Sequence, residues 1–124
     1  MPPYSGDEFE EFFAAYIDAA IFFDAPEGYC HLDLNDESIE QAKIDCKKFL
    51  DTNFQYIGND YLFQAGHDFW LTRNRHGDGY WGRPEVYGGI KTAKILTDSS
   101  HKFGELNIDA RLESKNEHDC LYFY

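Results

Sequence analysis

The sequence predicts a single small α+β domain over residues 1–124, with two N-terminal helices packed on antiparallel hairpins in the order ααββαββ. Three observations lead to this prediction. A chain of 124 residues is long enough to bury about two-thirds of its unfolded surface. Aromatic residues make up 18% of the chain and can fill a core. The spacing of apolar residues is helical before about residue 58 and alternates, as in strands, in parts of the chain after it.

The first predicted helix covers residues 7–23. Its apolar residues form a stripe about 100° wide, which is typical of a core-facing side; they are Phe9, Phe12, Phe13, Tyr16, Ala20 and Phe23. The opposite side carries Asp7, Glu8, Glu11 and Asp18. Ser5 or Asp7 is the expected N-cap, and the Pro26–Gly28 region ends the helix.

The second predicted helix follows Asn35 and Asp36. One side of it carries Ile39, Ala42, Cys46, Phe49 and Leu50. Because Cys46 lies in the middle of this apolar stripe, we expect a buried, inert thiol. The odd number of cysteines, three, and the absence of C-x-x-C spacing indicate neither a disulfide framework nor a zinc ribbon, and favour a reducing compartment.

The second half of the chain predicts strands and one short helix. Residues 67–73 and 80–83 are expected to form a hairpin around a polar turn at 74–79. A short helix is expected to start with Thr97 as its N-cap and to end before Gly104. Residues 105–112 alternate as in a strand, and residues 120–124 are expected to pair with them after a turn at 114–119.

The stretch HDFWLTRNRHGDGYW, residues 67–81, concentrates chemically active side chains. Its imidazoles and carboxylates suit zinc, manganese or iron, the candidate ligands being His67, Asp68, His76 and Asp78. In a hairpin, however, the first two would lie far from the last two. We therefore expect neither a bound metal nor another cofactor.

The same stretch has the composition of a platform for single-stranded nucleic acid. Such platforms combine cations with stacking rings; here these are Arg73, Arg75 and Arg83 with Trp70, Tyr80 and Trp81. The net charge of −12 argues against this interpretation. We expect instead that the rings form core, that at least one tryptophan is buried with its indole N–H bonded, and that the arginines neutralise acids of the first helix.

The excess negative charge lies in the first third of the chain. Residues 1–42 contain eleven acids and no lysine or arginine, whereas the other 82 residues carry twelve acids and eleven bases. Such a field repels nucleic acid and anionic membranes and attracts basic surfaces. The N-terminus has no basic segment and no apolar run approaches 18 residues, so neither secretion nor a membrane span is expected.

The block AGHDFWLTRNRHGDGYWGRP resembles the signature of a family of small acidic proteins encoded by tailed phages and related mobile elements, which reads approximately A-G-H-D-F-W-L-T-R-N-G-H-G-x-G-F-W-D-R. With flanking pieces around Cys46 and Phe103, the resemblance spans residues 39–110. Arg75 and Gly82 replace the usual Gly and Asp. The resemblance implies a phage or mobile-element protein in a bacterial cytoplasm, and it brings no activity or site residues with it.

These observations predict a phage-encoded acidic binding protein, rather than an enzyme, that inhibits or modulates a host nucleic-acid-acting protein. DNA mimicry against restriction or CRISPR machinery is the expected mode. The partner is expected to present a basic nucleic-acid-binding surface, with no direct binding of DNA or membrane by this chain; a homodimer is compatible with the sequence. The expected partner-binding residues are Asp7, Glu8, Glu10, Glu11 and Asp18.

The alternative function is a ligand, metal or single-stranded nucleic-acid site in residues 67–83. Its candidate residues are His67, Asp68, Trp70, Arg73, Arg75, His76, Asp78 and Trp81. The two functions differ in what the protein should bind: a mimic binds basic proteins, and a site protein binds metal or oligonucleotide.

Overall fold

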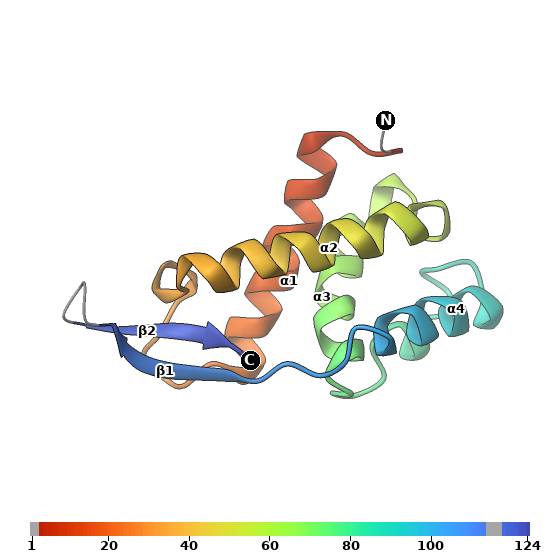
Figure 1. Cartoon of the computed structure of the whole chain (residues 1–124). Helices are drawn as coiled ribbons and strands as arrows, with labels where there is room; N and C mark the ends of the chain where they lie inside the picture. Colours follow the sequence, from red (N-terminus) through yellow and green to blue (C-terminus); the bar gives the residue numbers. More distant parts are fainter. Residues whose placement is uncertain (1–2, 114–117) are drawn as a thin grey trace.

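A computed structural model describes residues 3–113 and 118–124, with the backbone alone at 112–113 and 118–119. Most of this described chain is helical, and a β-hairpin lies at its C-terminal end (Figure 1). The long elements are α1 (Gly6–Asp24), α2 (Asp36–Ile57), α3 (Leu62–Arg73), α4 (Ile90–His101), β1 (Ile108–Glu113) and β2 (His118–Phe123). Short 3₁₀ helices connect them: η1 (His31–Asp33), η2 (Asn59–Tyr61) and η3 (Gly79–Gly82).

The predicted α+β order is wrong, because the expected hairpin at residues 67–83 does not exist. Residues 67–73 belong to the helix α3, and residues 80–82 form part of η3. The alternation of Phe69 and Leu71 with polar residues suggested a strand. In the fold, α3 lies in the middle of the molecule and has little polar exposed side to reveal a helical period. Its buried residues are Leu62, Ala65, Gly66, Asp68, Phe69, Trp70, Leu71, Thr72 and Arg73.

The predicted start of the fourth helix is also wrong. The helix begins at Ile90, and Thr97 lies inside it, where its hydroxyl donates to the carbonyl oxygen of Ala93 at 2.8 Å. A threonine can bond backwards to the preceding turn as readily as it caps a helix, and this is the reason for the error. The expected stop is close to the observed one, since Gly104 (φ +77°) follows the helix end at His101.

The prediction of α1 is confirmed. Ser5 is the N-cap, and a capping box forms because the Ser5 hydroxyl accepts from Glu8 N at 3.1 Å while the Glu8 carboxylate accepts from Ser5 N at 2.8 Å. Phe12, Tyr16 and Ala20 are buried, as the apolar stripe predicts. Phe23 is an exception, with 47% of its surface exposed.

The prediction of α2 is confirmed as well. Asn35 is the N-cap and accepts from Ser38 N at 3.0 Å. The thiol of Cys46 is fully buried together with Phe49 and Leu50, and burial raises the pKa of this thiol well above its ordinary value. Cys46 is therefore an inert core residue.

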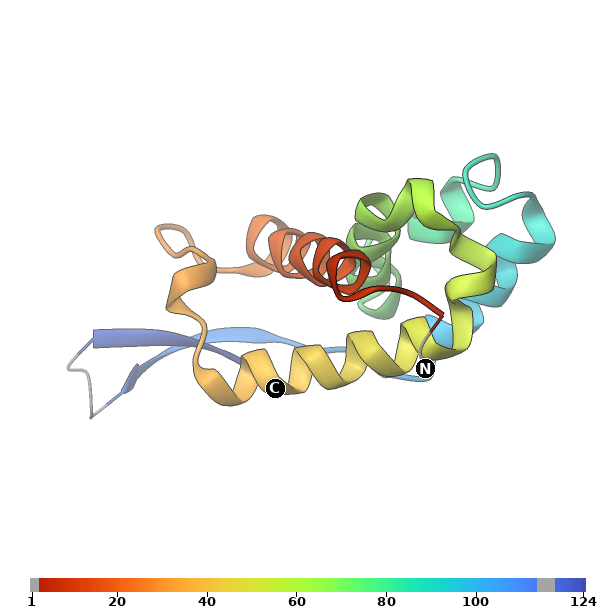
Figure 2. The same ribbon diagram turned by 90° about the horizontal axis from the view of Figure 1, so that it is seen from above.

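The core is an aromatic stack between α1, α2 and α3. Phe49 and Phe69 stack with ring centroids 4.2 Å apart, and Tyr16 meets the indole of Trp70 edge-on. Helices α1 and α3 approach to backbone contact, because a Cβ on Gly66 would lie 2.0 Å from the carbonyl oxygen of Phe12. In Figure 2, α2 and the hairpin lie along one side of this α1–α3 pair.

The C-terminal hairpin agrees with the predicted strands. β1 and β2 pair antiparallel from Ile108 opposite Phe123 to Glu113 opposite His118. The expected turn at 114–119 lies largely outside the described residues, which omit 114–117. Asn35 N donates to Leu121 O at 3.0 Å, and this bond ties the hairpin to the start of α2.

No helix in residues 3–113 or 118–124 has the length and apolar character needed to cross a membrane.

Candidate functional site

The residues of the block 67–83 separate into a core-facing set on α3 and an exposed set on the loop that follows α3. Arg73 belongs to the core-facing set and only 2% of it is exposed. Its guanidinium donates to the Tyr16 hydroxyl at 2.9 Å and to Asp45 Oδ2 at 2.8 Å. It also donates to the backbone carbonyl oxygens of Phe103 and Gly104, at 3.0 and 2.9 Å.

These bonds connect α1, α2, α3 and the segment after α4 through one cation. The sequence predicted that arginines of this block neutralise acids of the first helix, and for Arg73 this is wrong: its acid is Asp45 on α2. Because its donors are engaged and buried, Arg73 is unavailable to grip a nucleic acid.

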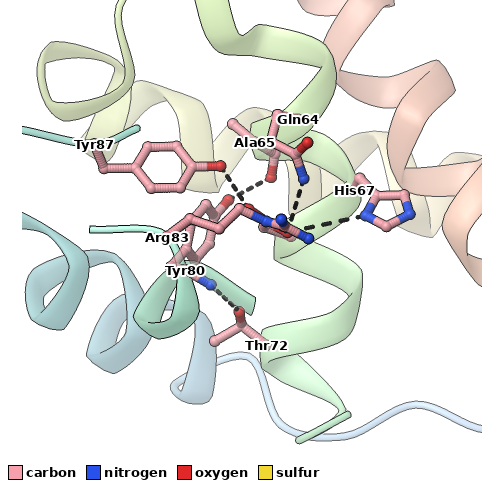
Figure 3. Close-up of polar contacts among 8 residues, drawn as sticks. Gln64, Ala65, His67, Thr72, Tyr80, Arg83 and Tyr87 are labelled. Atoms are coloured by element: carbon pink, nitrogen blue, oxygen red, sulfur yellow. Dashed lines mark hydrogen bonds and ion pairs between the residues drawn. The ribbon is translucent and has the colours of Figure 1, made fainter. Parts of the chain in front are cut away.

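Asp68 is the centre of a second buried network, and Figure 3 labels its partners Gln64, Arg83 and Tyr87. Its carboxylate is completely buried and accepts from the Tyr87 hydroxyl at 2.7 Å and from Gln64 Nε2 at 3.1 Å. Arg83 Nε lies 3.2 Å from both carboxylate oxygens. Since a buried carboxylate needs a charge partner and hydrogen bonds, this set of donors explains how Asp68 is tolerated in the core.

Two tyrosine hydroxyls, those of Tyr80 on η3 and of Tyr87 after η3, donate hydrogen bonds to α3 and hold this part of the chain against it. Burial raises the pKa of the Tyr87 and Tyr80 hydroxyls above the ordinary value, so both stay protonated. Tyr80 donates to the carbonyl oxygen of Ala65 at 2.5 Å, and Tyr80 N donates to the Thr72 hydroxyl at 3.2 Å. The Tyr80 and Tyr87 hydroxyls in Figure 3 are therefore hydrogen-bonded within the protein, and these bonds hold η3 and the residues after it against α3.

His67 lies at the edge of this network. Its Nδ1 is 3.9 Å from Asp68 Oδ1 and has no hydrogen-bond partner among the described residues. The ring also packs edge-on against Phe23, with the centroids 5.5 Å apart. His67 thus faces the end of α1 and a different hollow from the one that His76 lines.

Trp70 fulfils the prediction of a buried tryptophan with a bonded indole. It is completely buried, and Nε1 donates to Asp24 Oδ2 at 2.6 Å. The other oxygen of Asp24 lies 2.8 Å from Nε2 of His76. Asp24 therefore connects the end of α1 to α3 and to the loop after α3.

The exposed loop after α3 borders an open cleft of about 630 Å³. The cleft is lined by Phe23, Leu71, Arg75, His76, Gly77, Asp78, Gly79, Gly82 and Arg83. Each cationic or imidazole group there already faces an acid: Arg75 faces Glu105 at 3.6 Å, His76 faces Asp24, and Arg83 faces Asp68. The cleft consequently offers little positive charge to an anionic ligand.

The candidate metal ligands are not gathered in one place. His67 and Asp68 are on α3, whereas His76 and Asp78 lie on the following loop. Within the described part of the chain, no three His, Cys, Asp or Glu side chains are arranged to hold a metal ion.

The candidate stacking rings are mostly enclosed. Trp70 and Tyr80 are completely buried, whereas Trp81 is 49% exposed. Of the rings and arginines proposed for a single-strand platform, Trp81, Arg75 and Arg83 keep contact with solvent.

The predicted partner-binding acids lie on α1 and differ in whether their carboxylates already form hydrogen bonds or ion pairs within the described chain. Asp7, Glu10, Glu11 and Asp18 are exposed, and among the described residues none of them is within an ion pair. Glu8 is engaged in the capping box of α1. One oxygen of the Glu8 carboxylate is therefore engaged within α1.

Sequence reasoning missed the hydrogen-bond partners of Trp70, Asp68 and Arg73, which are Asp24, Tyr87, Asp45 and Tyr16. Each comes from an element distant in sequence, so no local pattern links it to α3. One local signal existed for Asp45, which directly precedes Cys46 in the middle of an apolar stripe. An acid at that position is expected to need a buried cation.

Comparison of the chain with protein-family models, with curated proteins and with solved structures finds no match.

Proposed function

We propose that this protein binds, through the acidic outer side of α1, a basic nucleic-acid-binding surface of another bacterial protein and thereby inhibits or modulates it. The observation that carries the proposal is the set of exposed carboxylates without a cationic neighbour in the described chain: Asp7, Glu10, Glu11 and Asp18. A fold that needed these charges for its own stability would pair them, as it pairs Arg73 with Asp45 and Arg83 with Asp68.

The spacing of these acids suits a surface that normally binds a phosphate backbone. Asp7, Glu11 and Asp18 are four and seven residues apart, so they share one side of the helix. With a rise of about 1.5 Å per residue, they form a row roughly 16 Å long. Duplex DNA carries about one charge per 1.7 Å of axis, so the row offers a sparse imitation of a phosphate track to lysine and arginine side chains.

The proposal includes the phage origin suggested by the block AGHDFWLTRNRHGDGYWGRP. A phage protein of this kind acts in the cytoplasm of the bacterial host, and restriction or CRISPR nucleases are the expected class of target. The buried positions of Asp68, Trp70 and Arg73 favour this function over the alternative site in residues 67–83, because three of its eight residues are enclosed in the core.

The test is affinity purification from bacterial lysate, followed by measurement of the affinity for the captured protein. We expect a nucleic-acid-binding protein whose complex is competed by duplex DNA and weakened by salt. The double variant Glu11→Gln/Asp18→Asn should weaken binding, chiefly by slowing association. Glu8 is left unchanged because its replacement would remove the capping box.

The matched control is Asp60→Asn/Glu85→Gln, which removes the same charge from exposed sites outside α1. Equal loss of affinity in both double variants would indicate a general effect of net charge. No loss in Glu11→Gln/Asp18→Asn would contradict the proposal and direct attention to Arg75 and His76.

A further inference from the structure

Four large apolar side chains are exposed around the end of α1. Phe22 and Leu32 are each 81% exposed, Phe63 is 50% exposed and Phe23 is 47% exposed. We refer to these four residues as the apolar patch. Contiguous exposed apolar surface on a soluble protein marks an interaction site, whereas isolated apolar residues do not.

Phe22 and Phe23 contact each other, and the other two members of the apolar patch lie on η1 and α3, the elements that line the same hollow. The rings of Phe22 and Phe23 meet edge-on at 4.9 Å between centroids, and the Phe23 ring contacts His67. Phe63 precedes His67 by four residues on α3, so both lie on the same side of that helix. Leu32 follows His31 in η1, which contacts α1.

The apolar patch borders a hollow of about 470 Å³. Its lining comes from α1, η1 with the residue before it, and α3; the residues are Asp18, Ile21, Phe22, Cys30, His31 and His67. The hollow is a place where an apolar side chain of a partner can insert beside the Phe22 ring.

The surroundings of the apolar patch are acidic. Asp18 lines the hollow, and Glu11 lies two turns earlier on the same side of α1. Glu27 and Asp33 lie in the connection between α1 and α2, and residues 3–42 contain no lysine or arginine. His31, His67 and Cys30 line the same hollow.

The acidic surroundings indicate which kind of partner the apolar patch can bind: a second copy of the chain, a membrane or another protein. A second copy of this chain would bring one acidic rim against another, in a protein whose net charge is −12. An anionic membrane would be repelled for the same reason. A protein that presents an apolar side chain within a ring of lysines and arginines is complementary in both respects.

We infer that Phe22, supported by the other residues of the apolar patch, anchors such a basic partner protein, with the acids of α1 forming the rim of the interface. The inference rests on the proposed function and adds that Phe22 contributes a large part of the binding free energy at that interface. Protein interfaces commonly concentrate their binding energy in a few central aromatic residues, while charges at the rim govern association rate and salt dependence.

The test uses a defined probe, a fluorescent helical peptide of leucine and lysine with its leucines on one side, and measures binding by fluorescence anisotropy. The double variant Phe22→Ser/Leu32→Ser is expected to bind at least about tenfold more weakly than the unchanged protein. Ile90→Ser is the matched control, because Ile90 is 66% exposed on α4. It should change the affinity by less than about twofold.

Two further peptides separate anchoring from charge attraction. A peptide of the same composition with its leucines scattered around the helix, and a peptide with glutamate in place of lysine, should both bind much more weakly. If the scattered peptide binds equally well, or if Phe22→Ser/Leu32→Ser has no effect, the anchor is overturned while the proposed function survives. If Glu11→Gln/Asp18→Asn also has no effect, the proposed function fails with it.

A second copy of the chain or a membrane at the apolar patch would each give a different experimental result. Sedimentation that shows a dimer of the unchanged protein and a monomer of Phe22→Ser/Leu32→Ser would assign the apolar patch to a second copy. Flotation with anionic phospholipid vesicles that is lost in the same variant would assign it to a membrane. Either result would overturn the inference.

Discussion

Trp70 donates its indole N–H to Asp24 across 2.6 Å and so joins the C-terminal end of α1 to the most buried part of α3. The same carboxylate faces His76, and thus one acid holds a helix end, a buried ring and an exposed loop. Trp70 also meets the rings of Tyr16 and Phe123, which come from the two ends of the chain. Within the block 67–83, which the sequence indicated as a possible binding site, Trp70 therefore has a structural role: it holds α1, α3 and β2 together.

Truncation of Trp70 should therefore destabilise the protein severely. Trp70→Ala is expected to lower the free energy of unfolding by about 3–5 kcal/mol, because it leaves a cavity and removes the donor to Asp24. Urea denaturation followed by circular dichroism measures the change. Trp81→Ala is the control and should cost less than about 1 kcal/mol, since Trp81 is 49% exposed. Equal losses in the two variants would contradict the assignment of Trp70 to the core.

The contact between α1 and α3 should be intolerant of a single added carbon at Gly66. A Cβ there would lie 2.0 Å from the Phe12 carbonyl oxygen and 3.1 Å from Ala15 Cβ, so the helices must separate. We expect Gly66→Ala to lower the free energy of unfolding by about 1–3 kcal/mol, despite the higher helix propensity of alanine. Gly6→Ala is the control, because no atom lies within 4 Å of its Cβ position. A stabilised Gly66→Ala variant would show that the helices do not meet there.

Removal of Arg73 should cost far more than removal of Arg75, two residues away. Arg73→Met leaves Asp45 as a buried charge without a cationic partner and is expected to lower the free energy of unfolding by about 3–5 kcal/mol. Arg75 is exposed and has a left-handed backbone (φ +58°), which glycine adopts without strain. Arg75→Gly should therefore be neutral or stabilising by up to about 1 kcal/mol. Thermal melts of both variants test this, and a destabilised Arg75→Gly would contradict the exposed placement of the loop.

Alkaline pH should unfold the protein through its buried tyrosines. Burial raises the pKa of Tyr16, Tyr80 and Tyr87 above the ordinary value, so the folded state keeps these protons after the unfolded chain has lost them. Their stabilising effect is complete below about pH 10 and is lost as the pH rises further. Each group should contribute a slope of about 1.4 kcal/mol per pH unit to the fall in the free energy of unfolding.

Urea denaturation between pH 9 and 11.5 measures that slope. Tyr80→Phe should reduce the slope by the contribution of one tyrosine, about 1.4 kcal/mol per pH unit. Tyr61→Phe should leave the slope unchanged, because Tyr61 is 45% exposed. An identical slope in the unchanged protein and in Tyr80→Phe would show that Tyr80 ionises as an exposed tyrosine does.

The sequence by itself determined the elements whose two sides differ in polarity. α1 and α2 each have a buried stripe and a solvated side, and their caps, Ser5 and Asn35, are of the residue types that cap helices. The alternation after residue 105 likewise predicted β1, because Leu106, Ile108 and Ala110 pack against the core. In these segments the local pattern records burial directly.

Only the tertiary structure determined that residues 62–73 form a helix, and that the polar residues Asp68 and Arg73 of this helix are buried. α3 contacts α1, α2, η3 and α4 and keeps little polar surface in contact with solvent, so its helical period is hidden and its residues suggested a strand. In the sequence, Asp68 was a candidate metal ligand and Arg73 a candidate phosphate contact, because charged side chains rarely lie in a core. Their partners, Arg83 with Tyr87 and Asp45 with Tyr16, come from separate elements that meet only after folding, and this long-range pairing is what makes both charges structural.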